Sequence, residues 1–149
     1  IRLAKRSGGE ITVFRRRFSP TSTADLAHAL FAIAQQVDCD ANAWGTYHYA
    51  GLETKREAEF GRQTLDYAAN HDEDIYQLID SIKLLEVPVR LPELLNSTLS
   101  SKKIFDTFGI KPRSWHGHLR ETIKSLYGGR MRVAREQGED DASGASVDS

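Results

Sequence analysis

The 149-residue sequence contains very little cysteine and no long apolar run. Cys39 is its only cysteine, which excludes a disulfide framework and is typical of a reducing compartment. No stretch approaches the roughly 20 apolar residues that a membrane-spanning helix needs, and the N-terminus lacks the apolar core of a signal peptide. We therefore expect a soluble, cytoplasmic protein with no membrane partner.

Charge is unevenly distributed, although the formal net charge is only -1. Hydrophobic residues make up 40% of the chain, which is enough for one core of ordinary size and predicts one domain over residues 1–129. The acidic residues near the C-terminus lie among Gly, Ala and Ser, a composition that buries too little apolar surface to order the chain. Residues 130–149 are therefore predicted to form a disordered acidic tail. Basic residues gather in the first seventeen positions: Arg2, Lys5, Arg6, Arg15, Arg16 and Arg17, against Glu10 alone.

The pattern of apolar residues predicts two strands and a helix in the first half of the chain. Residues 2–6 read like the end of a helix already begun, so we expect a segment of a longer protein. A β-branched and aromatic run predicts a strand over 10–16, and two tyrosines in alternation predict another over 46–50. Between them, Ser22 and Asp25 are spaced as a capping box. The apolar stripe of that helix is Leu26, Leu30, Ile33 and Val37.

Four more helices are predicted after residue 53. Thr54 and Glu57 form a second capping box, and acidic residues 72–74 favour the next helix N-terminus. Ser100 or Ser101 caps a helix that ends at Gly109, and the last helix begins at Ser114. Their apolar stripes are Ala58, Gly61, Leu65 and Ala68; Ile75, Leu78, Ile79 and Ile82; Ile104, Phe105 and Phe108; and Trp115, Leu119, Ile123 and Leu126.

The expected fold class is mixed α/β, helix-rich, with two or three short strands. So few strands do not make a self-sufficient sheet, because isolated pairs are only marginally stable in water. We expect them to extend a sheet supplied by another part of the protein. Alone, the segment is expected to be marginally stable or self-associating, since unpaired strand edges would remain, and a homo-oligomer stays open.

The order of these pieces resembles the C-terminal portion of dTDP-4-dehydrorhamnose reductases, which belong to the extended short-chain dehydrogenase class. Each piece is short, and the specificity lies in their order over residues 1–128. The pieces are Pro20 and Thr21, Asp25 to Ala27, Gly45 to Gly51, Phe60, Asn96 to Leu99 with Lys102 or Lys103, Phe108 to Ile110, and Trp115 with Leu119.

The resemblance implies the substrate-side half of an NADPH- or NADH-dependent enzyme that reduces a keto group on a nucleotide-linked deoxysugar. In that family a separate Rossmann portion holds the cofactor in a Gly-rich turn, and a Tyr with a Lys four residues later protonates the carbonyl. Neither motif occurs here: no tyrosine has Lys four residues on. This chain is thus expected to supply no catalytic, cofactor or metal residues and to act with a Rossmann portion.

Two departures from the family pattern affect the substrate site. Arg15, Arg16 and Arg17 replace an acidic and amide-bearing run, and the Arg-Pro-x-Asn-Ser stretch is lengthened here. The resulting candidate substrate-binding residues are Arg15, Arg17, Thr21, Arg90 and Asn96.

Each candidate has a structural alternative. Guanidinium groups match diphosphate oxygens in bidentate geometry, but the arginines could equally form a solvated strand end, where Arg16 opposes its neighbours. Asn96 suits hydroxyl or base recognition, or simply turns the chain. Nucleic acid is disfavoured, because the sequence pI is 6.6 and no aromatic-rich binding motif is present.

Other chemistry-bearing residues favour structural roles. His116 and His118 are two apart, whereas helical zinc pairs need spacings near four, and no base is paired with Cys39. Trp115 could stack on a base, but its helical spacing favours core packing. A rival class also stays open: a non-catalytic, reductase-like regulatory or scaffolding subunit, similar to the regulatory subunit of methionine adenosyltransferase.

Overall fold

The computed structural model describes residues 1–39 and 43–128, with only the backbone described for Glu93 and Leu94. The predicted tail over 130–149 lies outside this part of the chain. The helices are α1 (Arg2–Arg6), α2 (Thr23–Asp38), α3 (Glu57–Ala69), α4 (Glu73–Leu78) and α5 (Lys102–Phe108), with a 3-10 helix, η1 (Pro92–Leu95). Residues 115–128 are also helical and are called the C-terminal helix below. The strands are β1 (Glu10–Phe14), β2 (Arg17–Phe18), β3 (Lys55–Arg56) and β4 (Lys83–Val87).

The helix-rich, mixed α/β class is confirmed, and the described strands form two pairs, of which β1–β4 is parallel and β2–β3 is antiparallel. β1 pairs with β4 in parallel, with Ile11 opposite Leu84. The sequence predicts no strand over the β4 residues, and it places Ile82, just before β4, in the stripe of the preceding helix. That helix, α4, ends at Leu78, and the apolar residues that follow it enter the sheet.

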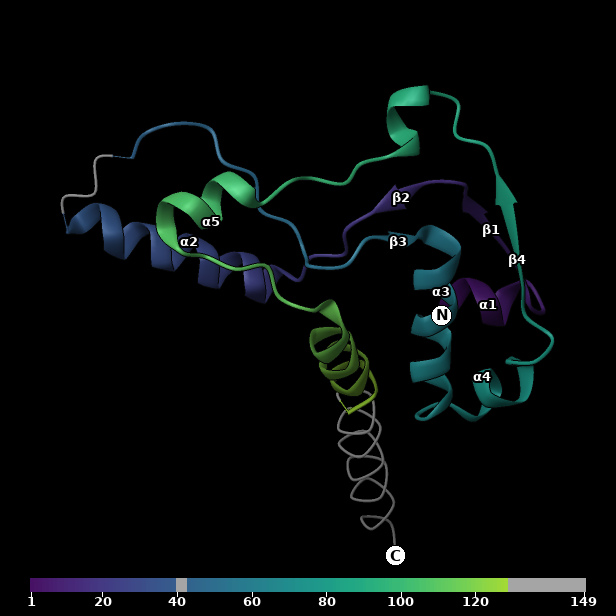
Figure 1. Ribbon diagram of the computed structural model, residues 1–149. Coiled ribbons are helices and arrows are strands. Elements are labelled where there is room, and N and C mark those ends of the chain that lie inside the picture. The colour runs from purple at the N-terminus through teal and green to yellow at the C-terminus, as the bar shows by residue number, and fades with distance from the viewer. Residues whose placement is uncertain (40–42, 129–149) are drawn as a thin grey trace, which may run out of the picture.

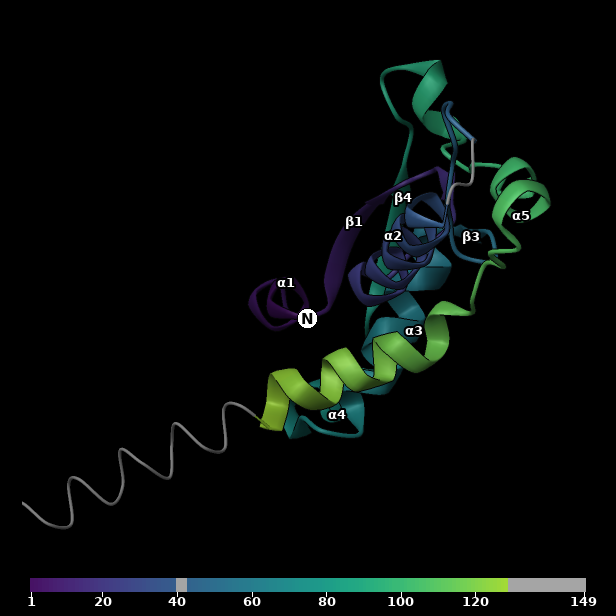
Figure 2. The same ribbon diagram turned by 90° about the vertical axis from the view of Figure 1, so that its left-hand side faces the viewer.

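The elements form two lobes (Figures 1 and 2). One lobe holds the β1–β4 sheet with α1, α3 and α4, and the other holds α2 and α5. Irregular segments on either side of α2 connect them. The C-terminal helix runs beside α3, and its Ile123 joins the core of the sheet lobe. The buried members of this core are Ala4, Leu65, Ala68, Ile75, Ile82 and Ile123.

One face of the β1–β4 sheet is covered and the other is open. Val13 is buried and Leu84 packs into the core, whereas Phe14 and Leu85 are exposed. Parallel sheets almost always have both faces covered, since each face is apolar. The open face therefore leaves the apolar side chains of Phe14 and Leu85 without the cover that a parallel sheet usually has.

Two details of the predicted elements are wrong. Residues 46–50 form no strand: the backbone N–H and C=O of Ala50 bond to Ser101 Oγ at 3.0 and 3.4 Å instead of to a neighbouring strand. Helix α3 is capped at Arg56 rather than Thr54, because residues 55 and 56 pair with β2. The backbone N–H of Arg56 donates to the Glu59 carboxylate at 3.2 Å.

Three predicted helix stripes also differ from the observed packing. On α5, Ile104 and Phe108 are buried as predicted, but Phe105 is 42% exposed. Helix α2 buries Asp25 and Ala29, leaving Leu30 59% exposed. Leu26 and Val37 are exposed as well. On the C-terminal helix Leu126 is exposed, although Trp115 and Ile123 are buried as predicted. No helix in the described ranges is long and apolar enough to cross a membrane.

Candidate functional site

Arginines follow the carboxyl ends of both strands of the parallel sheet. Because β1 and β4 are parallel, Arg15 and Arg90 come after the same edge. The Arg15 N–H donates to the Val87 carbonyl at 2.7 Å, which extends the ladder by one residue. Ligands of open α/β sheets bind beyond this edge. We call the residues Arg15, Arg17, Arg56 and Arg90 the basic rim.

Arg17 and Arg56 lie opposite each other in the β2–β3 pair. Two like charges in such a pair destabilise it unless a counter-charge is near. Glu59 neutralises Arg56 through an ion pair of 2.9 Å. The backbone N–H of Arg56 and then its guanidinium lower the pKa of Glu59. Arg17 is exposed and makes no ion pair with any described residue, so its charge is free for a ligand.

The structure brings together two of the predicted site residues, Arg17 and Asn96. They form a parallel β-bridge, and the Ser97 N–H donates to the Arg17 carbonyl at 2.9 Å. The Asn96 Oδ1 accepts from Thr98 N at 3.2 Å and Thr98 Oγ1 at 2.9 Å. The Asn96 side-chain carbonyl therefore turns the chain, and its amide N–H groups remain for a ligand.

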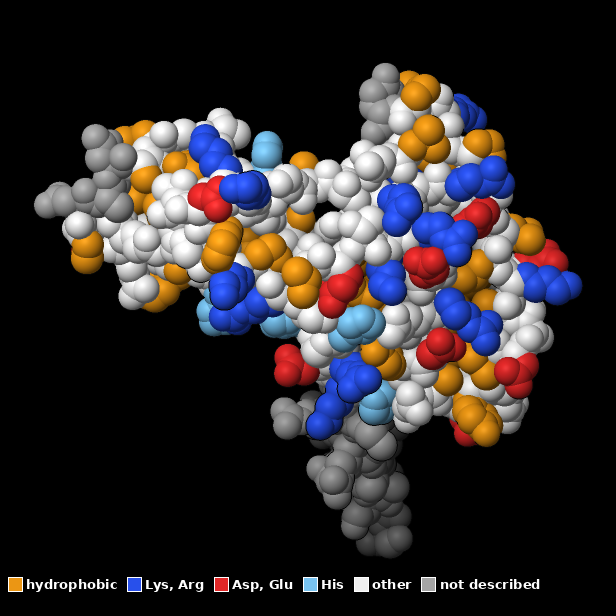
Figure 3. Space-filling view, viewed as in Figure 1, with side chains coloured by type: hydrophobic (Ala, Val, Ile, Leu, Met, Phe, Trp, Pro, Cys, Tyr) orange, Lys and Arg blue, Asp and Glu red, His pale blue; other side chains and the backbone are white. Residues whose placement is uncertain are grey.

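The other arginines have different surroundings. Arg15 is exposed, 3.8 Å from the Glu86 carboxylate. Arg16 ion-pairs with Glu57, and its guanidinium carbon lies 5.9 Å from the Phe18 ring centroid. Arg90 is exposed. In this part of the molecule, Lys and Arg side chains gather with acidic side chains among them (Figure 3). Arg56, which the sequence analysis missed, enters the rim only through strand pairing.

Thr21 occupies the junction between the lobes. Its hydroxyl donates to the Ser19 carbonyl at 3.0 Å and accepts from the Gly51 N–H at 2.9 Å. Both hydrogen bonds hold backbone atoms of the segments on either side of α2 in place. Thr21 also lines a cavity of about 160 Å³, together with Trp115 and His118. The described contacts connect it to this junction rather than to the basic rim.

Asp25 joins three segments near the same junction. Its backbone N–H donates to Ser22 Oγ at 3.0 Å, which confirms half of the predicted capping box. Its carboxylate does not return the bond: it accepts from the Tyr49 hydroxyl at 2.7 Å and lies 3.5 Å from Arg113 Nε. The buried Asp25 carboxylate therefore links α2 to the segments that carry Tyr49 and Arg113. The Asp-Leu-Ala motif alone did not indicate these contacts.

Alkaline pH is expected to weaken the hydrogen bond between Tyr49 and Asp25. Burial, and then the Asp25 carboxylate, raise the pKa of Tyr49 to about 12. Between about pH 10, where an unfolded tyrosine ionises, and pH 12, only the folded chain keeps the proton, so stability falls as pH rises. In urea unfolding across this range, Tyr49→Phe should lose less stability than the wild type. Equal losses in both proteins would contradict the assignment.

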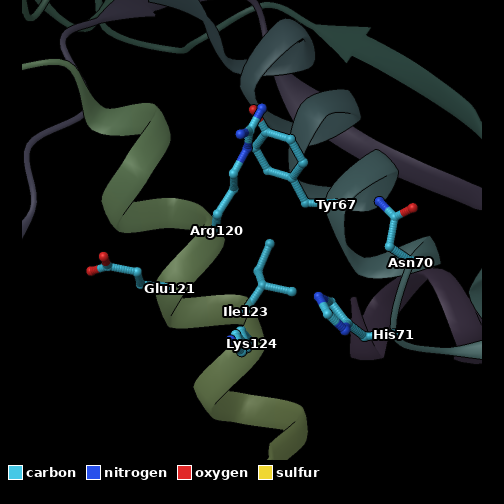
Figure 4. A pocket seen from close by; sticks show the side chains of 7 residues that line it. All are labelled: Tyr67, Asn70, His71, Arg120, Glu121, Ile123 and Lys124. Atoms are coloured by element: carbon cyan, nitrogen blue, oxygen red, sulfur yellow. The ribbon is translucent and has the colours of Figure 1, made fainter.

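A larger cavity lies between α3 and the C-terminal helix (Figure 4). It has a volume of about 310 Å³ and is lined by Tyr67, Asn70, His71, Arg120, Glu121, Ile123 and Lys124. The Arg120 guanidinium carbon lies 4.9 Å from the centroid of the Tyr67 ring, while Glu121 points away. The Tyr67 hydroxyl contacts His116 Nδ1 at 3.3 Å. Because Arg120 already covers the Tyr67 ring, this cavity is less suited to a ligand than the basic rim.

Within the described ranges, no group of three or more His, Cys, Asp or Glu side chains could hold a metal ion. His116 contacts Gln63 and Tyr67. Trp115 packs against Phe60 at 5.2 Å between ring centroids, and its burial favours the core role over base stacking.

The described fold is mixed α/β, and the basic rim lies at the carboxyl edge of its parallel strand pair. The family described as RmlD substrate binding domain matches residues 1–127, and the chain belongs to this family. A search of curated proteins gave no match.

Proposed function

We propose that this chain is the sugar-nucleotide-binding portion of a dTDP-4-dehydrorhamnose reductase-like oxidoreductase. The full-length protein would reduce the keto group of a nucleotide-linked 4-keto-deoxysugar with NADPH or NADH in the cytoplasm. One observation carries the proposal: in a chain of this family, Arg17 lies beside Asn96 near the carboxyl edge of the parallel sheet, and it makes no ion pair with a described residue. Guanidinium groups bind diphosphate oxygens through charge-assisted hydrogen bonds.

The roles of the rim residues follow from their surroundings. Arg17, with Arg15 and Arg90 at the same edge, would bind the diphosphate, and the Asn96 amide would donate to a sugar hydroxyl or base. Thr21 would act indirectly, because its hydroxyl is used to hold Gly51.

The residues of this chain do not fit the nicotinamide cofactor. Gly8 and Gly9 precede β1, and Arg15 to Arg17 follow it, so no Gly-rich turn follows the strand. No step of hydride transfer is assigned to these residues. The exposed Phe14 and Leu85 face of the sheet suits packing against the Rossmann portion that would hold the cofactor.

The test is an assay of the full-length protein with dTDP-4-keto-deoxysugar and either NADPH or NADH, followed by loss of cofactor absorbance. Turnover that requires the sugar nucleotide would support the proposal. Tight binding of the sugar nucleotide without turnover would contradict the catalytic part and leave the binding role.

One set of contacts favours a second candidate, a non-catalytic regulatory or scaffolding subunit. Arg16 ion-pairs with Glu57 and Asn96 Oδ1 turns the chain, so part of the altered motif serves the fold. This candidate predicts that the Rossmann portion lacks an intact Gly-rich turn and Tyr-Lys pair. Sequencing the full coding region decides between the two.

A further inference from the structure

A groove between α3 and the C-terminal helix is basic, and the proposed function does not use it. It is the cavity of about 310 Å³ that Figure 4 shows, and this volume lies at the lower end of the usual range for small-molecule sites. We call it the helix groove. Three of its lining residues are basic: His71 from the turn after α3, and Arg120 and Lys124 from the C-terminal helix. All three are exposed.

The cations of the helix groove are not neutralised within the described ranges. Arg120 and Lys124 lie one turn apart on the same helix, and neither makes an ion pair with a described residue. Arg120 contacts the Tyr67 ring instead, and such a contact leaves the guanidinium charge in place. Like charges four residues apart destabilise a helix, so an anion close to both side chains would stabilise it.

The acidic residues around the helix groove are committed elsewhere. Asp66, on α3, lies 3.3 Å from Arg62, and Asp72, which follows α3, lies 2.8 Å from Lys5. Glu121 lines the cavity, but Figure 4 shows its side chain pointing away from it. The groove therefore stays positive, and Figure 3 shows basic and histidine side chains side by side over the C-terminal helix.

The arrangement of side chains along the helix groove indicates the shape of its ligand. Arg120 points to one end of the groove, Lys124 and His71 lie toward the other, and Ile123 lies between them (Figure 4). The middle of the groove is therefore apolar and both ends are basic. Because the three basic side chains are exposed, a small molecule would stay largely in water here, whereas a protein segment needs to insert only its side chains.

We propose that the helix groove docks an acidic segment of a partner protein, in which an apolar side chain lies between two carboxylates. Alternate side chains of an extended segment share one face, so the sequence pattern is acid-x-apolar-x-acid. One carboxylate accepts from the Arg120 guanidinium and the other from the Lys124 ammonium and the His71 ring, while the apolar side chain packs over Ile123. A lone phosphate would reach only one end, and a nucleotide base would find the Tyr67 ring already covered by Arg120. The site is independent of the basic rim and of the proposed reductase role.

Fluorescence anisotropy with the full-length protein tests the proposal, using a labelled peptide of sequence Ser-Glu-Ser-Leu-Ser-Glu-Ser. Replacing both glutamates of the peptide with glutamine should weaken binding by about tenfold, and replacing its leucine with serine by about threefold. In the protein, Arg120→Gln and Lys124→Gln should each weaken binding by about threefold and together by about tenfold. Arg17→Gln is the matched control, because it removes an exposed arginine of the basic rim, and it should leave the affinity unchanged.

Several results would overturn the proposal. One is equal affinity for the original peptide and either modified peptide, and another is unchanged binding in the double variant of Arg120 and Lys124. Loss of binding in Arg17→Gln would move the peptide to the basic rim. The substituted side chains are exposed, so the thermal unfolding midpoints of the variants should match that of the wild type.

Two further measurements separate the partner segment from other occupants of the helix groove. A sedimentation coefficient that changes in the double variant without peptide would assign the groove to a second copy of the chain and overturn the proposal. A tenfold gain in peptide affinity on deletion of residues 136–149 would assign it to the acidic run of this chain, with the same consequence. Failure of the reductase assay would leave these tests unaffected.

Discussion

Replacing Gly51 with alanine is expected to destabilise the protein by about 3 kcal/mol or more, a large fraction of the stability of a typical domain. A Cβ at this position would lie 2.0 Å from the Pro20 carbonyl oxygen and 3.1 Å from its carbon. Both are backbone atoms, so no side chain can move aside. Relief would require moving the backbone around the hydrogen bond from the Gly51 N–H to Thr21 Oγ1. Urea unfolding monitored by circular dichroism measures the loss.

Gly117→Ala is the matched control for this substitution. Gly117 lies in the C-terminal helix, and a Cβ there would meet nothing within 4 Å. Alanine should therefore be neutral or stabilise the helix by about 0.5–1 kcal/mol. If Gly51→Ala were as stable as Gly117→Ala, the close packing of the lobe junction would be disproved.

Replacing Trp115 with alanine should cost about 3–5 kcal/mol, the usual range for a buried tryptophan. Trp115 is 3% exposed, and its ring packs on Phe60, which in turn packs on Phe18 with 5.4 Å between centroids. This aromatic row holds the C-terminal helix to α3 and β2. Its loss would free the helix that contributes Ile123 to the core. Thermal unfolding and denaturant midpoints report the change.

Two further substitutions, Trp44→Ala and Trp115→Phe, serve as controls. Trp44 is 86% exposed, so Trp44→Ala should change stability by less than about 0.5 kcal/mol. Trp115 Nε1 has no hydrogen-bond partner among the described residues, so Trp115→Phe should retain most of the stability. Similar losses in Trp44→Ala and Trp115→Ala would show that burial of Trp115 does not hold the C-terminal helix.

Helix placement was largely predictable from local signals. Ser22 caps α2, and Gly109 ends α5 in the left-handed conformation with φ of 69°, both as the sequence indicated. The acidic run 72–74 was predicted at the start of α4, and its first residue, Asp72, is the N-cap. These signals act within a few residues of the chain, which is why they can be read without the fold.

Contacts between distant segments were not predictable in this way. The strand β4 was missed because its pairing with β1 joins segments about seventy residues apart. The predicted apolar stripe of α2 faces inward, yet the helix buries Asp25 and Ala29 and leaves the stripe residue Leu30 59% exposed. Periodicity identifies the faces of a helix, but the tertiary packing decides which face is buried.

In the candidate site, too, local features could be predicted from the sequence and contacts between distant segments could not. The basic character of residues 15–17 was visible in the sequence, and so was the Asn96 loop. That Arg17 lies beside Asn96 and opposite Arg56 depends on the β-bridge and on the β2–β3 pair. The hydrogen bond between Asp25 and Tyr49 likewise joins residues that no local motif connects.

The most direct test of the central claim is the affinity of the full-length protein for dTDP in Arg17→Gln and Arg120→Gln. Loss of a charge-assisted contact to the diphosphate should weaken binding by about tenfold to a hundredfold in Arg17→Gln. Arg120 covers the Tyr67 ring in another part of the molecule, so Arg120→Gln should bind dTDP as the wild type does. Unchanged affinity in Arg17→Gln, or an equal loss in Arg120→Gln, would contradict the claim that the basic rim binds the nucleotide diphosphate.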